Sequence, residues 1–142
     1  MAEKILLIDD EAEFVETLAA RMRSRQMEVS TATSAAEALQ REDVDSYDAI
    51  VLDLQMPGMD GLAALEEIKK RNPQLQVILL TGKATVEKGV QAMKMGAMDL
   101  LEKPADIEEL TRKIKEAGDR KMVLVTAASE KQVKEIIGSK AW

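Results

Sequence analysis

Five short apolar segments, separated by stretches long enough for a helix, constrain the fold more than any other feature of this chain. They are rich in Ile, Leu and Val, a composition typical of strands buried on both faces of a parallel sheet. Helices that connect parallel strands cross over with a right hand and cover both faces of the sheet. The predicted strands span residues 4–9, 28–32, 48–53, 76–81 and 98–102.

The intervening segments carry helix signals. Residues 12–25 repeat apolar side chains at helical spacing, and Ser34 followed by Glu37 is a capping signature for the next helix. The third helix is predicted to begin at Asp60 and to end before Asn72. The fourth is predicted to span about 84–95, and the fifth to run from Asp106 to about Gly118. This alternation predicts an α/β, flavodoxin-like (βα)5 doubly wound parallel sheet with strand order 2-1-3-4-5. The more polar strand at 28–32 is expected at an edge.

The length of 142 residues suits one domain. We expect this domain to occupy residues 1–118, because the strand and helix pattern ends there. Residues 119–142 are expected to form a C-terminal extension that is partly helical, with a short helix over 129–137. An extension of this size cannot build a second domain with its own core.

The composition excludes several classes of function. The chain has 20 Lys and Arg against 26 Asp and Glu, a net charge of -6, and no basic run that would offset this acidic balance, so a nucleic-acid partner is not expected. It has no cysteine and no histidine, which excludes disulfides, thiolate or imidazole metal ligands and a phosphohistidine on this chain. No signal-peptide layout and no apolar run of ~18 residues is present, so a cytoplasmic protein without a membrane contact is expected.

Polar residues of reactive type stand where four of the five strands end. Asp9 and Asp10 follow the first strand, Asp53 ends the third, Thr81 ends the fourth and Lys103 follows the fifth. Taken singly, an aspartate at a strand end is most often a loop residue or a helix cap, and a lysine before proline is most often solvated. Parallel strands, however, place their carboxyl ends along one edge, where open α/β sheets bind ligands. We therefore expect these side chains to converge on one crevice.

The converging side chains predict a phosphoryl-transfer site. Three carboxylates repel each other, and Mg²⁺ suits a site made of oxygen ligands. Lys103 adds a compact positive charge for a phosphate oxygen, and Thr81 adds a hydroxyl donor. Positioning and charge neutralisation dominate phosphoryl transfer. Asp53 is the predicted nucleophile, which would form an aspartyl phosphate.

Four motifs at these positions resemble the receiver domain of two-component response regulators. They are Ile-Asp-Asp at 8–10, Leu-Asp-Leu-Gln-Met-Pro-Gly-Met-Asp-Gly at 52–61, Leu-Thr-Gly at 80–82 and Glu-Lys-Pro at 102–104. The resemblance covers about residues 3–118. It implies a receiver domain at 1–118 that acts as a phosphorylation switch and not as an enzyme.

The resemblance also implies how the acidic residues act. Asp53 would be the phosphoacceptor. Asp10, Asp53 and the main-chain carbonyl of Gln55 would hold Mg²⁺ directly, and Asp9 would hold it through water. The donor would be a phosphohistidine on a sensor histidine kinase or phosphotransfer protein, in agreement with the absence of histidine here.

By the same resemblance, Thr81 and Lys103 would contact the phosphoryl oxygens, and the bond from Lys103 to Pro104 would be cis. One position departs from the family. A Tyr or Phe usually stands three residues before the lysine and moves with phosphorylation, whereas Leu100 stands there in this chain. The ring-flip form of the switch is therefore not available.

The helix at 84–95 and the strand after it form the usual output surface of the family. The resemblance implies output by protein contact, either with a downstream partner, within a phosphorelay or by self-association, so a monomer or a phosphorylation-dependent dimer is expected. Gly89 would make this helix mobile. Gln55 and Lys83 would flank the path of the hydrolytic water and slow hydrolysis, or they are simply solvated. The chain is either a regulator without an effector domain or a receiver from a longer protein.

Three other functions compete with this interpretation. A flavodoxin-like cofactor binder needs a phosphate loop after the first strand, and the sequence Asp9-Asp10-Glu11 repels phosphate. An aspartyl-phosphate hydrolase fits the acidic crevice, but no cap domain is evident. A receiver-like scaffold without phosphorylation is disfavoured by the intact set of site residues, although Leu100 leaves it some room.

Overall fold

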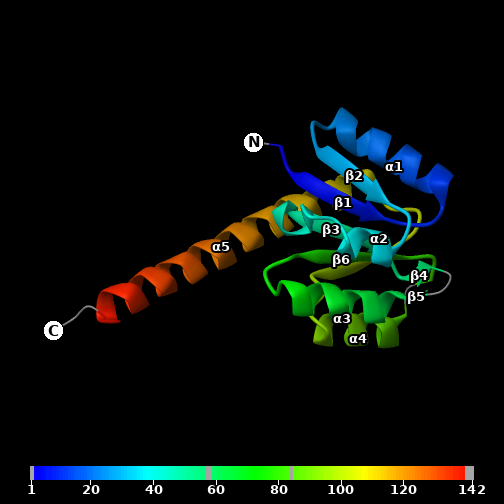
Figure 1. The fold of residues 1–142 in the computed structure, drawn as a ribbon. Helices are drawn as coiled ribbons and strands as arrows, with labels where there is room; N and C mark the ends of the chain where they lie inside the picture. Colours follow the sequence, from blue (N-terminus) through cyan, green and yellow to red (C-terminus); the bar gives the residue numbers. More distant parts are fainter. Residues whose placement is uncertain (1, 57–58, 84, 140–142) are drawn as a thin grey trace.

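The computed structural model describes residues 2–56, 59–83 and 85–139, without the side chains of residues 55–60 and 134–139. The main sheet has five parallel strands in the order β2-β1-β3-β6-β7 (Figure 1). The strands are β1 (Lys4–Ile8), β2 (Glu28–Ala32), β3 (Ala49–Asp53), β6 (Val77–Thr81) and β7 (Asp99–Glu102). The predicted order 2-1-3-4-5 is confirmed, since β6 and β7 are the fourth and fifth predicted strands, and β2 lies at an edge as expected.

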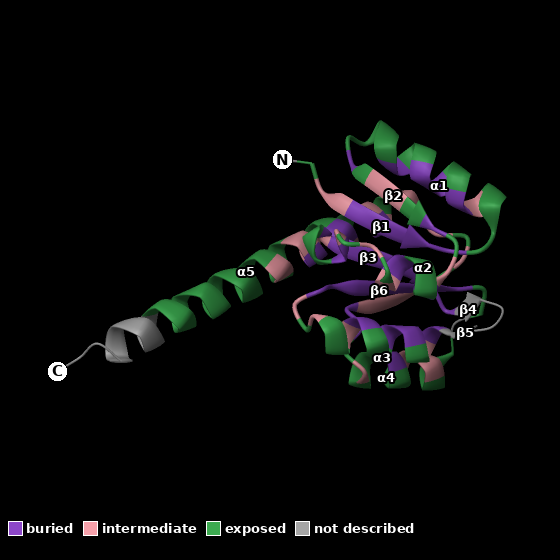
Figure 2. Ribbon diagram, viewed as in Figure 1, coloured by how far each residue is buried: buried purple, intermediate pink, exposed green. Residues whose placement is uncertain are grey.

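Helices cover both faces of this sheet. On one face lie α1 (Ala12–Ser24) and α5 (Ile107–Ser139), and on the other lie α2 (Ala35–Leu39), α3 (Gly61–Arg71) and α4 (Val86–Lys94), with the 3-10 helix η1 (Val44–Ser46) before β3. Because side chains alternate between the faces of a strand, β1 serves two cores. Ile5 and Leu7 pack toward α1 and α5, and Leu6 and Ile8 pack toward α2, α3 and α4. Figure 2 shows the resulting burial of the central strands.

The capping signals at two helix starts are confirmed. The Ser34 hydroxyl accepts a hydrogen bond from the Glu37 N–H at 3.1 Å, at the start of α2. The Asp106 carboxylate accepts one from the Glu108 N–H at 2.9 Å, at the start of α5. The predicted cap at Asp60 lies among the side chains that the structure does not describe.

Two short strands occur where the sequence predicts only a loop. β4 (Gln55–Met56) and β5 (Met59–Asp60) pair antiparallel directly after β3. The chain then enters α3 so close to the end of β3 that a Cβ on Gly61 would lie 2.5 Å from the Cα of Leu54. Only glycine allows this approach, so the return of the chain after β3 depends on Gly61.

The helices α1 and α4 end in the same hydrogen-bond pattern, the Schellman motif. After α4, the Gly96 N–H donates to the Met93 carbonyl at 3.2 Å and the Ala97 N–H donates to the Ala92 carbonyl at 3.0 Å. Gly96 has a φ of +95°, which glycine adopts readily. After α1, Gln26 takes the equivalent place with a φ of 68°. A residue with a side chain therefore holds a position that favours glycine.

The predicted end of the last helix at Gly118 is wrong. α5 continues without a break to Ser139 and projects away from the rest of the protein, and the separate helix expected at 129–137 is part of it (Figure 1). Gly118 stays helical because the residues that follow it favour helix and no proline stops the chain. Beyond Lys121 the described side chains are exposed, and Met122 is 70% exposed. Among the described residues, no helix combines the length and apolarity needed to cross a membrane.

Candidate functional site

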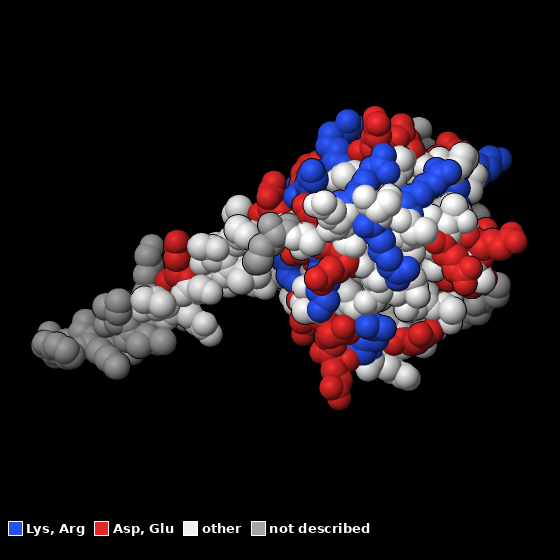
Figure 3. All heavy atoms as spheres, turned by 90° about the horizontal axis from the view of Figure 1, so that it is seen from above, with Lys and Arg blue, Asp and Glu red and all other residues white. Residues whose placement is uncertain are grey.

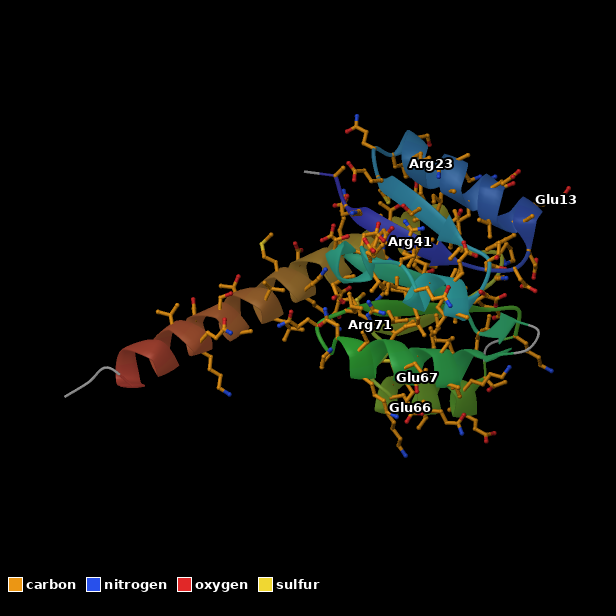
Figure 4. The ribbon with its side chains drawn as sticks, in the orientation of Figure 1. Glu13, Arg23, Arg41, Glu66, Glu67 and Arg71 are labelled. Carbon is orange, nitrogen blue, oxygen red and sulfur yellow. The ribbon has the colours of Figure 1, made fainter. Side chains whose placement is uncertain are left out.

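The carboxyl ends of the parallel strands meet at one edge of the sheet and bring the predicted site residues to it. Asp53 and Thr81 are the last residues of the neighbouring strands β3 and β6, Asp9 follows β1, and Lys103 follows β7. The helix α1 begins at the same edge, near the place where Figure 4 labels Glu13. The sheet topology alone thus explains how residues far apart in the sequence reach one site.

Three carboxylates lie together at this edge. One carboxylate oxygen from each of Asp9, Asp10 and Asp53 lies within 4.8 Å of the other two. Asp9 and Asp53 are only 1% and 2% exposed, whereas Asp10 is exposed. The Asp9 carboxylate is fixed by the Glu11 N–H, which donates to it at 2.9 Å. Buried negative charges this close together need a cation beside them, and a set of oxygen ligands suits a hard divalent cation.

The ammonium of Lys103 is a cation within this cluster. Its Nζ lies 2.9 Å from the Asp9 carboxylate, 3.4 Å from the Asp53 carboxylate and 3.4 Å from the Glu11 carboxylate. Burial disfavours the charged lysine, but the hydrogen bond to Asp9 and the charges of Asp9, Asp53 and Glu11 outweigh this effect and raise the pKa of Lys103 above its ordinary value. The Lys103–Pro104 peptide bond is cis, as the resemblance implies. The Lys103 N–H donates to the Thr81 carbonyl at 2.7 Å, which ties the end of β7 to β6.

Thr81 is fully buried at the end of β6. Its hydroxyl oxygen lies 3.3 Å from both the N–H and the carbonyl of Lys83, so the hydroxyl is held by the backbone of the loop that follows. The side chain of Lys83 is exposed, in agreement with the solvated alternative for this residue. The side chain of Gln55 is not described, and the roles expected for its carbonyl and its side chain stay predictions.

Leu100 occupies the position where the family usually has an aromatic ring. It lies on β7, partly buried against the core on the α2, α3 and α4 side. Gly89 of α4 faces it, since a Cβ at residue 89 would lie 3.9 Å from the Leu100 side chain. Among the methionines of this region, Met98 is buried, whereas Met93 is exposed together with Val86 and Val90 of α4. Met98 therefore belongs to the core, and Met93 belongs to the surface of α4.

The molecular surface agrees with an acidic site. In Figure 3, acidic side chains gather at the end of the molecule opposite the projecting part of α5, which is the end where the strands finish. Over the rest of that view, Lys and Arg side chains are mixed with Asp and Glu. This distribution suits the capture of a cation at the site and gives no basic face in that view.

Sequence reasoning missed two residues of the site, Glu11 and Phe14. Glu11 pairs with Lys103, and the Lys103 ammonium lies over the Phe14 ring, 4.3 Å from its centroid. The sequence places Phe14 on the apolar face of the first helix, and it does pack against that core. The sequence does contain a signal that Phe14 lies near the site. Phe14 follows the acidic pair by about one helical turn, and the first turn of that helix borders the predicted crevice.

The family of the chain follows from this site and fold. Residues 5–115 match the family described as the response regulator receiver domain. The chain belongs to this family. The transcriptional regulatory protein ZraR of Escherichia coli strain K12 is 36% identical over 113 residues, which cover 80% of this chain and 26% of ZraR. This receiver chain therefore spans about a quarter of the length of that relative.

Solved receiver structures share the fold. A response regulator receiver domain protein from Clostridium thermocellum is 37% identical, with a TM-score of 0.81 over 86% of this chain and 98% of that chain. The beryllofluoride-activated NtrC4 receiver domain dimer is 33% identical, with a TM-score of 0.77 over 83% of this chain and 98% of that chain. These matches confirm the predicted family, and they favour a signalling domain over an enzyme or a flavin binder.

Proposed function

We propose that this receiver is a phosphorylation-controlled switch in which Asp53 accepts a phosphoryl group from a phosphohistidine on a sensor kinase or phosphotransfer protein. The observation that carries the proposal is the position of the Asp53 carboxylate, which is buried within 4.8 Å of two further carboxylates and 3.4 Å from a lysine ammonium. A nucleophile at the carboxyl edge of the sheet, with a metal-ligand cluster and a cation beside it, suits phosphoryl transfer.

The acidic cluster fits magnesium. Asp9, Asp10 and Asp53, together with the carbonyl of Gln55, would hold Mg²⁺, because they offer only oxygen ligands and the three carboxylates stand close enough to share one cation. When bound, the ion neutralises negative charge on the phosphoryl oxygens. Asp10 is the exposed member of the set and gives the cation a route from solvent.

The chain's own residues supply the rest of the reaction. A carboxylate oxygen of Asp53 attacks the phosphorus, the new O–P bond forms, and the N–P bond of the donor breaks with its electron pair left on the imidazole. Lys103 stands 3.4 Å from the attacking Asp53 carboxylate and would pair with a phosphoryl oxygen. Thr81 would turn its hydroxyl from the Lys83 backbone to another phosphoryl oxygen, and this movement would report the modification to the loop before α4.

Output by protein contact follows from this coupling. If the active conformer is a few per cent populated, phosphorylation must favour it by roughly 3–4 kcal/mol to make it dominant. A few charge-assisted hydrogen bonds from Thr81, Lys103 and nearby amides have that size. We propose a downstream protein, a phosphorelay partner or a second copy as the receiver of the signal. The exposed apolar side chains of α4, with Leu100 in place of the usual ring beneath it, are the proposed output surface.

Phosphorylation by acetyl phosphate in the presence of MgCl₂ tests the proposal. We expect one phosphoryl group per chain by intact-mass analysis, removed by hydroxylamine as acyl phosphates are. The label should be absent from Asp53→Asn and present in the matched control Asp119→Asn, which removes an exposed carboxylate of α5. Slow autodephosphorylation is expected, and Lys83→Ala should change its rate if Lys83 shields the acyl phosphate from water.

Other outcomes would support the competing functions. Turnover of many phosphate esters would favour the hydrolase, a bound yellow chromophore would favour the flavin binder, and no labelling despite bound Mg²⁺ would favour the scaffold. For the switch, Lys103→Ala should accept phosphate slowly but should not bind the downstream partner more tightly afterwards. An undiminished partner response in that variant would contradict the proposed role of Lys103. Beryllofluoride should bind the unmodified site and serve as bait for the partner.

A further inference from the structure

The ring of Phe14 is a neighbour of the Lys103 ammonium that the reaction described above does not use. Phe14 lies in the first turn of α1 and packs partly buried against the core shared with α5. The Lys103 Nζ lies 4.3 Å from the ring centroid. This distance is within the range of a cation–π interaction, in which the negative face of the ring attracts the cation.

The position of the Lys103 ammonium depends on the groups around it. Its ammonium sits on a flexible four-carbon stem, and its three carboxylate partners belong to Asp9, Asp53 and Glu11. The Glu11 side chain is largely exposed and can move into solvent, whereas the Phe14 ring is anchored in the core. The face of the ring is therefore a fixed surface beside the ammonium and also attracts its positive charge.

We propose that Phe14 is a positioning residue for phosphoryl transfer, whose ring holds the Lys103 ammonium beside the Asp53 carboxylate. The proposal rests on the function proposed for Asp53. An aliphatic side chain of similar size would fill the same space but would not attract the ammonium, so Lys103 would spend less time where an incoming phosphoryl oxygen meets it. The effect should appear in the rate of phosphorylation as well as in the stability of the fold, and the rate is the readout that a merely structural role would not change.

The test compares initial rates of phosphorylation by acetyl phosphate at a fixed MgCl₂ concentration. Phe14→Leu should lower the rate about fivefold, equivalent to about 1 kcal/mol, which is typical of a cation–π contact. Phe14→Tyr keeps the ring and should stay within twofold of the wild type. Val29→Ala is the matched control, because Val29 packs partly buried against the same core but lies on β2, away from the site. It should leave the rate unchanged.

A second background separates positioning from general structure. In Lys103→Met, adding Phe14→Leu should cause no further loss of rate, since the ring has no ammonium left to hold. An equal loss in both backgrounds would overturn the proposal, as would a Phe14→Leu rate equal to that of the wild type. A nuclear Overhauser effect between the Phe14 ring protons and the Lys103 ε-methylene in the wild type tests the contact itself. Its absence would also overturn the proposal, even if Phe14→Leu does not fold.

The failure of this inference is distinguishable from the failure of the proposed function. If the wild type takes up no phosphoryl group on Asp53, the proposed function fails and the role of Phe14 falls with it. If the wild type is phosphorylated and Phe14→Leu reacts as fast, only the positioning role is refuted.

Discussion

Replacing Lys103 with methionine should destabilise the metal-free protein by about 3 kcal/mol, a typical loss when one partner of a buried ion pair is removed. The Lys103 side chain is 13% exposed, and the side chains of its partners Asp9 and Asp53 are 1% and 3% exposed. At 2.9 Å from Asp9, the Coulomb attraction is about 6 kcal/mol for an effective dielectric constant of about 20. Desolvation of the charges offsets part of this attraction in the wild type. In the variant the two buried carboxylates remain, without the ammonium between them.

Magnesium should reverse most of this loss. A ligand at a hundred times its dissociation constant stabilises the native state by about 2.7 kcal/mol, which is close to the expected deficit. The free energy of unfolding is measured by urea denaturation with EDTA and again with MgCl₂. We expect the variant to gain more from Mg²⁺ than the wild type does, because in the wild type Lys103 already neutralises the same carboxylates.

A less buried ion pair with the same separation provides the control. Lys113 lies 2.9 Å from the Asp99 carboxylate, the same distance as in the Lys103–Asp9 pair, but these side chains are 27% and 31% exposed. Lys113→Met should therefore destabilise the protein by less than about 1 kcal/mol, and it should gain only as much stability from Mg²⁺ as the wild type does, because its carboxylate cluster is intact. Equal losses for Lys103→Met and Lys113→Met would refute the reasoning, because burial would then play no part.

Three further predictions concern pH, helix ends and the length of α5. The pKa of Lys103 is raised above its ordinary value of 10.5. Its contribution to stability is therefore complete below pH 10.5 and is lost as the pH rises through the folded-state pKa. Urea titrations should show this alkaline loss of stability in the wild type but not in Lys103→Met. Gln26→Gly should stabilise the protein by about 0.5–1 kcal/mol, and Gly96→Ala should destabilise it by at least as much, because both positions have positive φ. A Cβ at residue 96 would also lie 3.1 Å from the Lys69 side chain. Urea denaturation that gave a change of the same sign for both variants would contradict this prediction. A chain that ends at Lys121 should keep the melting temperature of the full chain while losing helical circular dichroism, since the described side chains beyond it are exposed, and a fall of many degrees would show that the extension supports the fold.

The sheet and the position of the site were predictable because both depend on simple patterns. β1, β3 and β6 are buried on both faces, so the sequence needs an unbroken apolar run at each of them, and such runs are visible. The residue that ends each run must stand at the carboxyl edge. Asp9, Asp53 and Thr81 therefore converge in any parallel sheet in which these strands are neighbours.

The features that escaped prediction depend on contacts or on competition between weak effects. Gly118 favours a helix end, but its cost of about 1 kcal/mol is smaller than the combined preference of the residues around it, so α5 continues. The β4–β5 pair has no apolar pattern of its own. The contact of Phe14 with Lys103 joins the first turn of α1 to the end of β7, and the apolar spacing of the helix signals only its burial in the core.

Because α5 is one continuous helix, a small change of its direction at the core becomes a large displacement at its far end. The helix begins four residues after Lys103 and runs for 33 residues, a length of about 50 Å at ~1.5 Å per residue. Leu110 and Ile114 pack its first turns into the core, so a shift of that part of the core would carry the whole helix with it. A tilt of about 5° at its base would sweep the far end through about 4 Å for a rod of that length.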